Sequence, residues 1–83
     1  MILRKDLKQK DLEAFAADYG PRTEGLSGRA RMAGAAVRSA VLAGWFTDLT
    51  AIEDVDTLTG RQVIELSQRI NDLYAEMVVL DPK

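Results

Sequence analysis

The sequence predicts an all-α protein, a small three-helix domain with a short extra helical turn between helices 2 and 3. Three separate stretches carry apolar residues at helical spacing. Capping pairs, glycines and prolines lie between these stretches. The acidic stretch after the chain's one tryptophan contains helix-capping residues rather than a strand pattern. We therefore expect one helical domain over residues 1–83, with residues 1–5 extended or frayed.

The first predicted helix lies in "DLKQKDLEAFAADYGP". Asp6 is the expected N-cap, with Gln9 as its partner in a pair that resembles a capping box. Gly20 followed by Pro21 predicts the end of the helix. Leu26, in the polar loop that follows, is expected to contact the core. The apolar residues at helical spacing are Leu12, Phe15, Ala16 and Tyr19.

The second predicted helix begins near Ser27 and ends near Gly44. Its apolar face is wide and consists of small residues. Gly34 costs this helix roughly 1 kcal/mol relative to alanine, so we expect another element to approach its backbone closely there. The residues of the face are Met32, Ala33, Ala36, Val37, Ala40, Val41, Ala43 and Gly44.

The remaining predicted elements are a short turn and a long last helix. Thr50 with Glu53 predicts a cap for the turn, and Thr59 with Gln62 predicts a capping box for the helix. The helix should end before Pro82, because the residue preceding a proline resists the α conformation. Its apolar residues are Val63, Ile64, Leu66, Ile70, Leu73, Tyr74, Met77, Val78 and Leu80.

The composition argues against several classes of function. The chain has no cysteine and no histidine, so it has no thiolate and no imidazole base or metal ligand. We expect no enzyme, no catalytic residue, no cofactor and no metal. The N-terminus is charged from Arg4 onward and therefore does not predict a signal peptide. No apolar run approaches the roughly 18 residues of a membrane span, so we expect no membrane association and a location in the cytoplasm.

Charges are unevenly distributed along the chain. Residues 22–38 carry four arginines and a single acid, whereas residues 48–56 carry four acids and no base. The arginines form a candidate basic patch that could bind phosphate. The favoured interpretation is that the basic and acidic segments are two solvated faces, which attract each other or meet an oppositely charged neighbour in an oligomer. The net charge is -2, and nucleic-acid binding is not expected. The acids fit no metal-binding motif. The candidate basic patch is Arg22, Arg29, Arg31 and Arg38.

Two apolar features allow both a structural and a functional interpretation. Trp45 and Phe46 follow the second helix directly, where they either close the core or anchor a partner. Residues 77–80 are apolar on all sides of the last helix, so they lie deep in the core or under another chain, including a second copy. The candidate partner-binding residues are Met32, Ala36, Trp45, Phe46, Met77 and Val79.

Three features together suggest a family. They are the Arg- and Ala-rich helix ending in "AGWF", the acidic "DLTAIEDVDTL", and the last helix "RQVIELSQRINDLYAEMVVLDPK". From residue 29 to residue 83 the chain resembles the small helical proteins encoded in tail modules of long-tailed bacteriophages. The matching positions are Ala43, Gly44, Trp45, Val63, Leu66, Ile70, Tyr74 and Pro82.

This resemblance implies a tail-assembly chaperone that binds the tape-measure protein in the cytoplasm of the bacterial host. A groove lined by small and flexible residues would suit an amphipathic helix. The alternative is a small phage regulator or inhibitor that binds a host protein, using the acidic residues 48–56 as a mimic of nucleic-acid charge.

Overall fold

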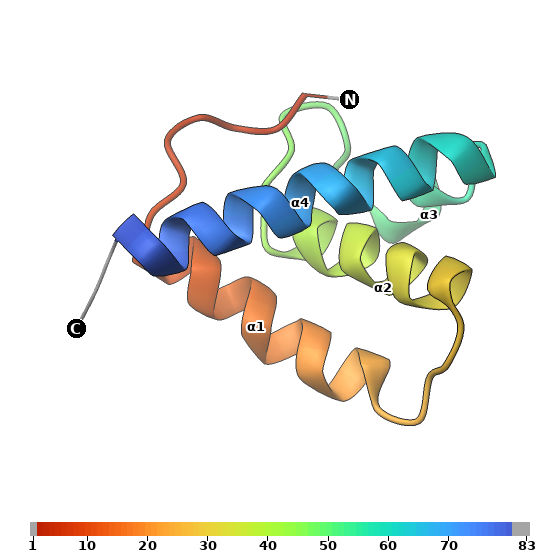
Figure 1. Cartoon of the computed structure of the whole chain (residues 1–83). Helices are drawn as coiled ribbons and strands as arrows, with labels where there is room; N and C mark the ends of the chain where they lie inside the picture. The colour runs from red at the N-terminus through yellow and green to blue at the C-terminus, as the bar shows by residue number, and fades with distance from the viewer. Residues whose placement is uncertain (1, 81–83) are drawn as a thin grey trace.

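The computed structural model describes residues 2–80, without the side chains of residues 79 and 80. These residues form α1 (Gln9–Thr23), α2 (Arg29–Leu42), the single turn α3 (Ile52–Val55) and α4 (Gly60–Leu80) (Figure 1). Over this range the chain has no strand, and one isolated antiparallel bridge joins Leu3 to Phe46. The all-α class predicted from the sequence is therefore confirmed.

Helix α2 lies at the centre of the fold. It packs extensively against both α4 and α1, whereas α1 and α4 contact each other over a short stretch only (Figure 1). Small side chains on α2 let both neighbours approach closely, which keeps the interior densely packed. One buried cluster joins the elements: Phe15, Ala36, Val37, Ala40, Val41, Trp45, Phe46, Leu49, Val55, Leu66 and Ile70.

The start of α1 differs from the prediction. Lys8 is the N-cap residue, and its backbone N–H donates to the carboxylate of Asp11 at 2.8 Å. An acid in the first turn also interacts favourably with the helix dipole. Asp6 is not the cap; it forms an ion pair with Arg4, with a distance of 3.1 Å from Nε to Oδ1.

The end of α1 also lies beyond the predicted stop. Pro21 is inside the last turn, and the helix continues to Thr23. The hydroxyl of Thr23 donates to the carbonyl oxygen of Tyr19 at 2.7 Å, which satisfies an acceptor near the helix end. Gly25, with φ of 79°, then turns the chain. Leu26 is 36% exposed, so the expectation that it contacts the core was wrong.

Helix α2 ends as expected but begins differently. Its N-cap is Gly28, with no side-chain cap, and a left-handed Gly44 follows its last turn. The reason for Gly34 also differs from the prediction. A Cβ atom there would lie 2.8 Å from Nη1 of Arg38, in the same helix. Gly34 therefore makes room for the Arg38 side chain, rather than for the backbone of another element.

The caps of the last two helices show one correction and one confirmation. Asp54, rather than Glu53, accepts hydrogen bonds from the backbone N–H groups of the two residues before α3, at 3.2 and 3.1 Å. Thr59 and Gln62 form the predicted capping box. The N–H of Thr59 donates to Oε1 of Gln62 at 2.9 Å, and the N–H of Gln62 donates to Oγ1 of Thr59 at 3.1 Å.

The N-terminal segment, residues 2–7, is extended at its start and is attached to the loop after α2 (Figure 1). The N–H of Arg4 donates to the carbonyl oxygen of Trp45 at 2.7 Å. The N–H of Thr47 donates to the carbonyl oxygen of Ile2 at 2.9 Å. The guanidinium of Arg4 also donates to the carbonyl oxygen of Gly44 at 3.0 Å. Residues 2–4 are thus held in place, while Met1 lies outside the described residues.

Candidate functional site

Trp45 and Phe46 lie in the interior. Trp45 is 0% exposed and Phe46 is 5% exposed. The indole ring of Trp45 packs on Phe15 of α1, with ring centroids 4.7 Å apart. Its Nε1–H donates to the carbonyl oxygen of Asp11 at 3.0 Å. The structure therefore places both aromatic residues in the core rather than on a surface where they could anchor a partner.

A groove, here called the aromatic groove, lies between α1 and α4 over α2. It consists of two adjoining hollows of about 320 and 190 Å³ that share Tyr19 and Asn71. The first hollow is lined by Phe15, Ala16, Tyr19, Gly20, Asn71 and Tyr74. The second is lined by Tyr19, Arg29, Met32, Ala33, Ala36, Ser67, Gln68 and Asn71.

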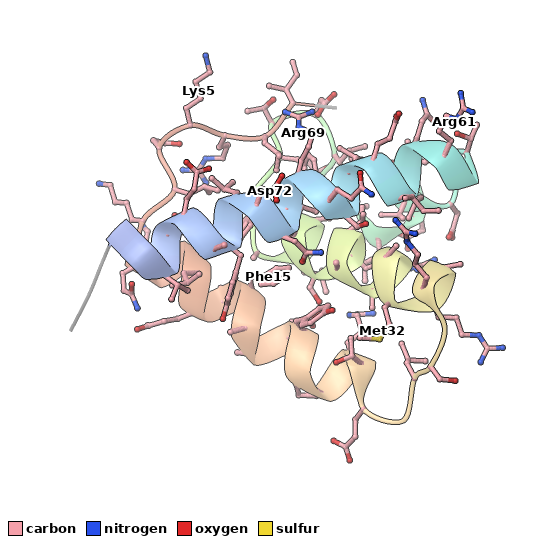
Figure 2. The ribbon with its side chains drawn as sticks, viewed as in Figure 1. Lys5, Phe15, Met32, Arg61, Arg69 and Asp72 are labelled. Carbon is pink, nitrogen blue, oxygen red and sulfur yellow. The ribbon has the colours of Figure 1, made fainter. Side chains whose placement is uncertain are left out.

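The shape of the aromatic groove follows from its residues. The Phe15 ring stacks on the Tyr19 ring, with ring centroids 5.2 Å apart, and contacts the Tyr74 ring of α4, with centroids 5.6 Å apart. Aromatic rings therefore line one end of the groove. The floor is α2, where alanines leave space that larger side chains would fill. Figure 2 shows Phe15 between α1 and α4, and Met32 between α1 and α2. Met32 and Ala36, two of the predicted partner-binding residues, therefore line one groove.

Three polar side chains of the aromatic groove lie exposed on its rim, whereas Ser67 is buried and donates its hydroxyl to the carbonyl oxygen of Ile64. Gln68 and Asn71 of α4 are exposed, and neither side chain makes a hydrogen bond within residues 2–80. Arg29 is exposed at the other end and has no ion pair in the described part of the chain. The rim can thus offer amide groups and one positive charge to a ligand that lies on the apolar floor.

A separate hollow, here called the N-terminal groove, lies between the N-terminal segment and the C-terminal half of α4. Its volume is about 570 Å³. Half-buried apolar side chains come from both walls, and charged groups surround them. The lining residues are Leu3, Arg4, Lys5, Leu7, Arg69, Asp72, Leu73, Glu76 and Met77. The predicted binding residue Met77 therefore lies here, away from Met32; the side chain of Val79 lies outside the described residues.

The four arginines of the candidate basic patch differ in their surroundings. Arg22 pairs with Asp18 at 2.7 Å and Arg38 with Asp56 at 3.0 Å. Arg29 and Arg31 are exposed and, within residues 2–80, have no carboxylate partner. The Arg38 pair joins the basic segment to the acidic one, in agreement with the interpretation of two charged faces that attract each other.

One polar link between helices was not predicted. Ser39 of α2 is fully buried, and its hydroxyl donates to Asp18 of α1 at 2.5 Å. The hydrogen bond from Arg22 lowers the pKa of Asp18, and the one from Ser39 adds to this effect, against partial desolvation. The i,i+4 spacing of Asp18 and Arg22 could have indicated their pair. Nothing in the sequence indicated Ser39, because its contact depends on how the two helices pack.

Three of the four acidic residues in the range 48–56 contribute to the fold, and the fourth, Glu53, is exposed. Asp48 accepts a hydrogen bond from the backbone N–H of Ile2 at 2.8 Å. Asp54 caps α3, and Asp56 pairs with Arg38. Across residues 2–80, no group of three or more acidic, histidine or cysteine side chains is arranged to hold a metal ion.

Comparisons with known proteins identify no relative of this chain. The chain matches no protein-family model, no curated protein and no solved structure. Among the helices of the described residues, none has the length and apolar character needed to cross a membrane.

Proposed function

We propose that this protein is a non-enzymatic, phage-type helical interaction protein that holds an amphipathic helix of another protein in the aromatic groove. The observation that carries this proposal is the pair of adjoining hollows between α1 and α4. Helix-binding grooves recognise an apolar stripe with flexible or small residues and leave polar groups at the rim. The alanine floor, Met32 and the aromatic wall supply such a surface.

The specific form of the proposal is a tail-assembly chaperone whose partner is the tape-measure protein. This form comes from the resemblance of residues 29–83 to phage tail-module proteins. A chaperone of this kind would bind the apolar stripe of the long tape-measure helix in the cytoplasm of the bacterial host, before the tail tube encloses it. A location of the gene directly before a very long tape-measure gene would support this assignment.

The alternative, a regulator that uses residues 48–56 as a mimic of nucleic-acid charge, receives less support. A charge mimic must present its carboxylates to a partner. Among residues 2–80, Asp54 and Asp56 are instead engaged with α3 and α2, and Asp48 binds the N-terminal segment, which leaves Glu53 as the one exposed carboxylate of the four without a side-chain hydrogen bond or ion pair. We therefore keep the helix-binding chaperone as the proposed function.

Two neighbouring alanines on α1 provide a matched test. Ala16 lines the aromatic groove and Ala17 does not, yet both are exposed. Ala16→Glu should place a charge in the apolar groove and abolish co-purification with the co-expressed tape-measure protein of the same gene module. Ala17→Glu should leave co-purification unchanged. Equal binding by both variants would contradict the groove as the site, and no binding by the wild type would contradict the chaperone assignment.

A further inference from the structure

The N-terminal groove presents an apolar floor that the chain itself only half covers. Leu3 and Leu7 come from the N-terminal segment, and Leu73 and Met77 come from α4; all four are partly exposed. The volume, about 570 Å³, is enough to receive several side chains of a partner. This groove is separate from the aromatic groove, with which it shares no lining residue.

The charges along this face of α4 are arranged in a self-complementary way. Arg69 and Glu76 are seven residues apart, which corresponds to two helical turns and about 10 Å along the axis. Both side chains are exposed, and neither forms an ion pair within residues 2–80. By contrast, three other arginines, Arg4, Arg22 and Arg38, each have a carboxylate partner.

We propose that the N-terminal groove receives α4 of a second copy of this chain, in an antiparallel dimer whose two-fold axis passes beside Leu73. Two antiparallel copies of a helix related in this way place residue 69 of each opposite residue 76 of the other. Arg69 and Glu76 then form two identical ion pairs, which flank the apolar contact made by Leu73, and Met77 lies just outside each pair. A two-fold interface requires such self-complementarity, because the same patch serves both subunits.

The remaining charges of the groove are compatible with this pairing. Asp72 lies close to the proposed axis, where the two copies would bring like charges together. Lys5 on the opposite wall lines the same groove and can offset that negative charge, whereas Arg4 is already paired with Asp6. Figure 2 shows Arg69 and Asp72 on the side of α4 next to the N-terminal segment, and Lys5 on that segment.

A charge exchange tests the dimer directly. Sedimentation of the wild-type chain over about 10 to 500 μM should show a reversible monomer–dimer equilibrium, since a short interface of this kind is at the weak end of specific contacts. Arg69→Glu or Glu76→Arg alone should raise the dimer dissociation constant at least about tenfold, because each change places like charges opposite each other. The double variant R69E/E76R should restore the wild-type value.

The control is Arg61→Glu, the same reversal on an exposed arginine at the far end of α4, outside the N-terminal groove (Figure 2). It should leave the dissociation constant unchanged. Far-ultraviolet circular dichroism should show equal helix content in all variants, because all three reversed residues are exposed. A wild-type chain that stays monomeric over the whole range would overturn the proposal. So would single reversals without effect, or a helical double variant that stays monomeric.

Discussion

The indole N–H of Trp45 donates to the backbone carbonyl oxygen of Asp11 at 3.0 Å, across 34 residues of sequence. This bond joins the end of α2 to the first turn of α1 through a side chain that is completely buried. A buried indole needs such a partner, because an unsatisfied N–H in the interior is costly. Trp45 therefore fastens α1 to the rest of the core, in addition to closing the end of α2.

We expect Trp45→Ala to lower the free energy of unfolding by roughly 3–5 kcal/mol, because it leaves a large cavity beside Phe15. Trp45→Phe should cost less, about 1–3 kcal/mol, since it keeps a ring but removes the indole N–H that donates to the Asp11 carbonyl. Urea unfolding followed by circular dichroism measures both. Leu42→Ala is the control, because Leu42 is 51% exposed; it should change stability by less than about 0.5 kcal/mol. A Trp45→Ala variant with wild-type stability but altered sedimentation would contradict the core interpretation.

Ala40 tests the close packing of α2. It is 0% exposed and belongs to the same buried cluster as Leu66 and Ile70 of α4. Ala40→Leu should therefore overpack this contact and cost roughly 1–3 kcal/mol in thermal or urea unfolding. Ala30→Leu, at an exposed position of the same helix, should cost less than about 0.5 kcal/mol. Equal costs at the two positions would argue against a tightly packed α2.

Gly34 and Arg38 should be energetically coupled. Replacing glycine by alanine in a helix interior usually stabilises it by roughly 1 kcal/mol. In the wild-type background, Gly34→Ala should stabilise the protein by less than this, because the new Cβ displaces the Arg38 guanidinium that pairs with Asp56. In an Arg38→Ala background the full gain should appear. A double-mutant cycle measured by urea unfolding checks this coupling, and equal gains in both backgrounds would contradict it.

Asp18 should make the stability depend on pH in the acid range. Its pKa is lowered in the folded state by the hydrogen bond from Arg22. A group with a lowered folded pKa contributes its full stabilisation above its unfolded pKa of about 3.9, and loses it as the pH falls through the folded value. Asp18→Asn should therefore be less stable than the wild type near pH 7, by roughly 1 kcal/mol. This difference should shrink below about pH 4.

The control for this titration is Glu24→Gln, which removes an exposed carboxylate. Its difference from the wild type should stay near zero across the same pH range. Thermal melts of the three proteins at several pH values provide the measurement. A constant gap for Asp18→Asn between neutral and acid pH would show that its charge does not stabilise the fold.

By itself, the sequence determined the features that depend on local spacing. The all-α class, the Thr59–Gln62 capping box and the glycine at the end of α2 were predictable because each involves residues within a few positions of one another. A local signal also misled at the start of α1. Asp6 was the expected cap, but it pairs with Arg4, and Asp11 accepts the hydrogen bond from the N–H of the N-cap residue Lys8.

The tertiary structure decided everything that depends on which faces meet. The sequence marked Trp45, Met32 and Met77 alike as candidate partner-binding residues, but packing buried the first and left the other two in separate grooves. The buried Ser39 contact and the extended pairing of the N-terminal segment arise from residues far apart in the chain. An apolar pattern shows only that a face avoids water, and the relative positions of the helices determine whether a neighbouring helix covers that face or leaves it open.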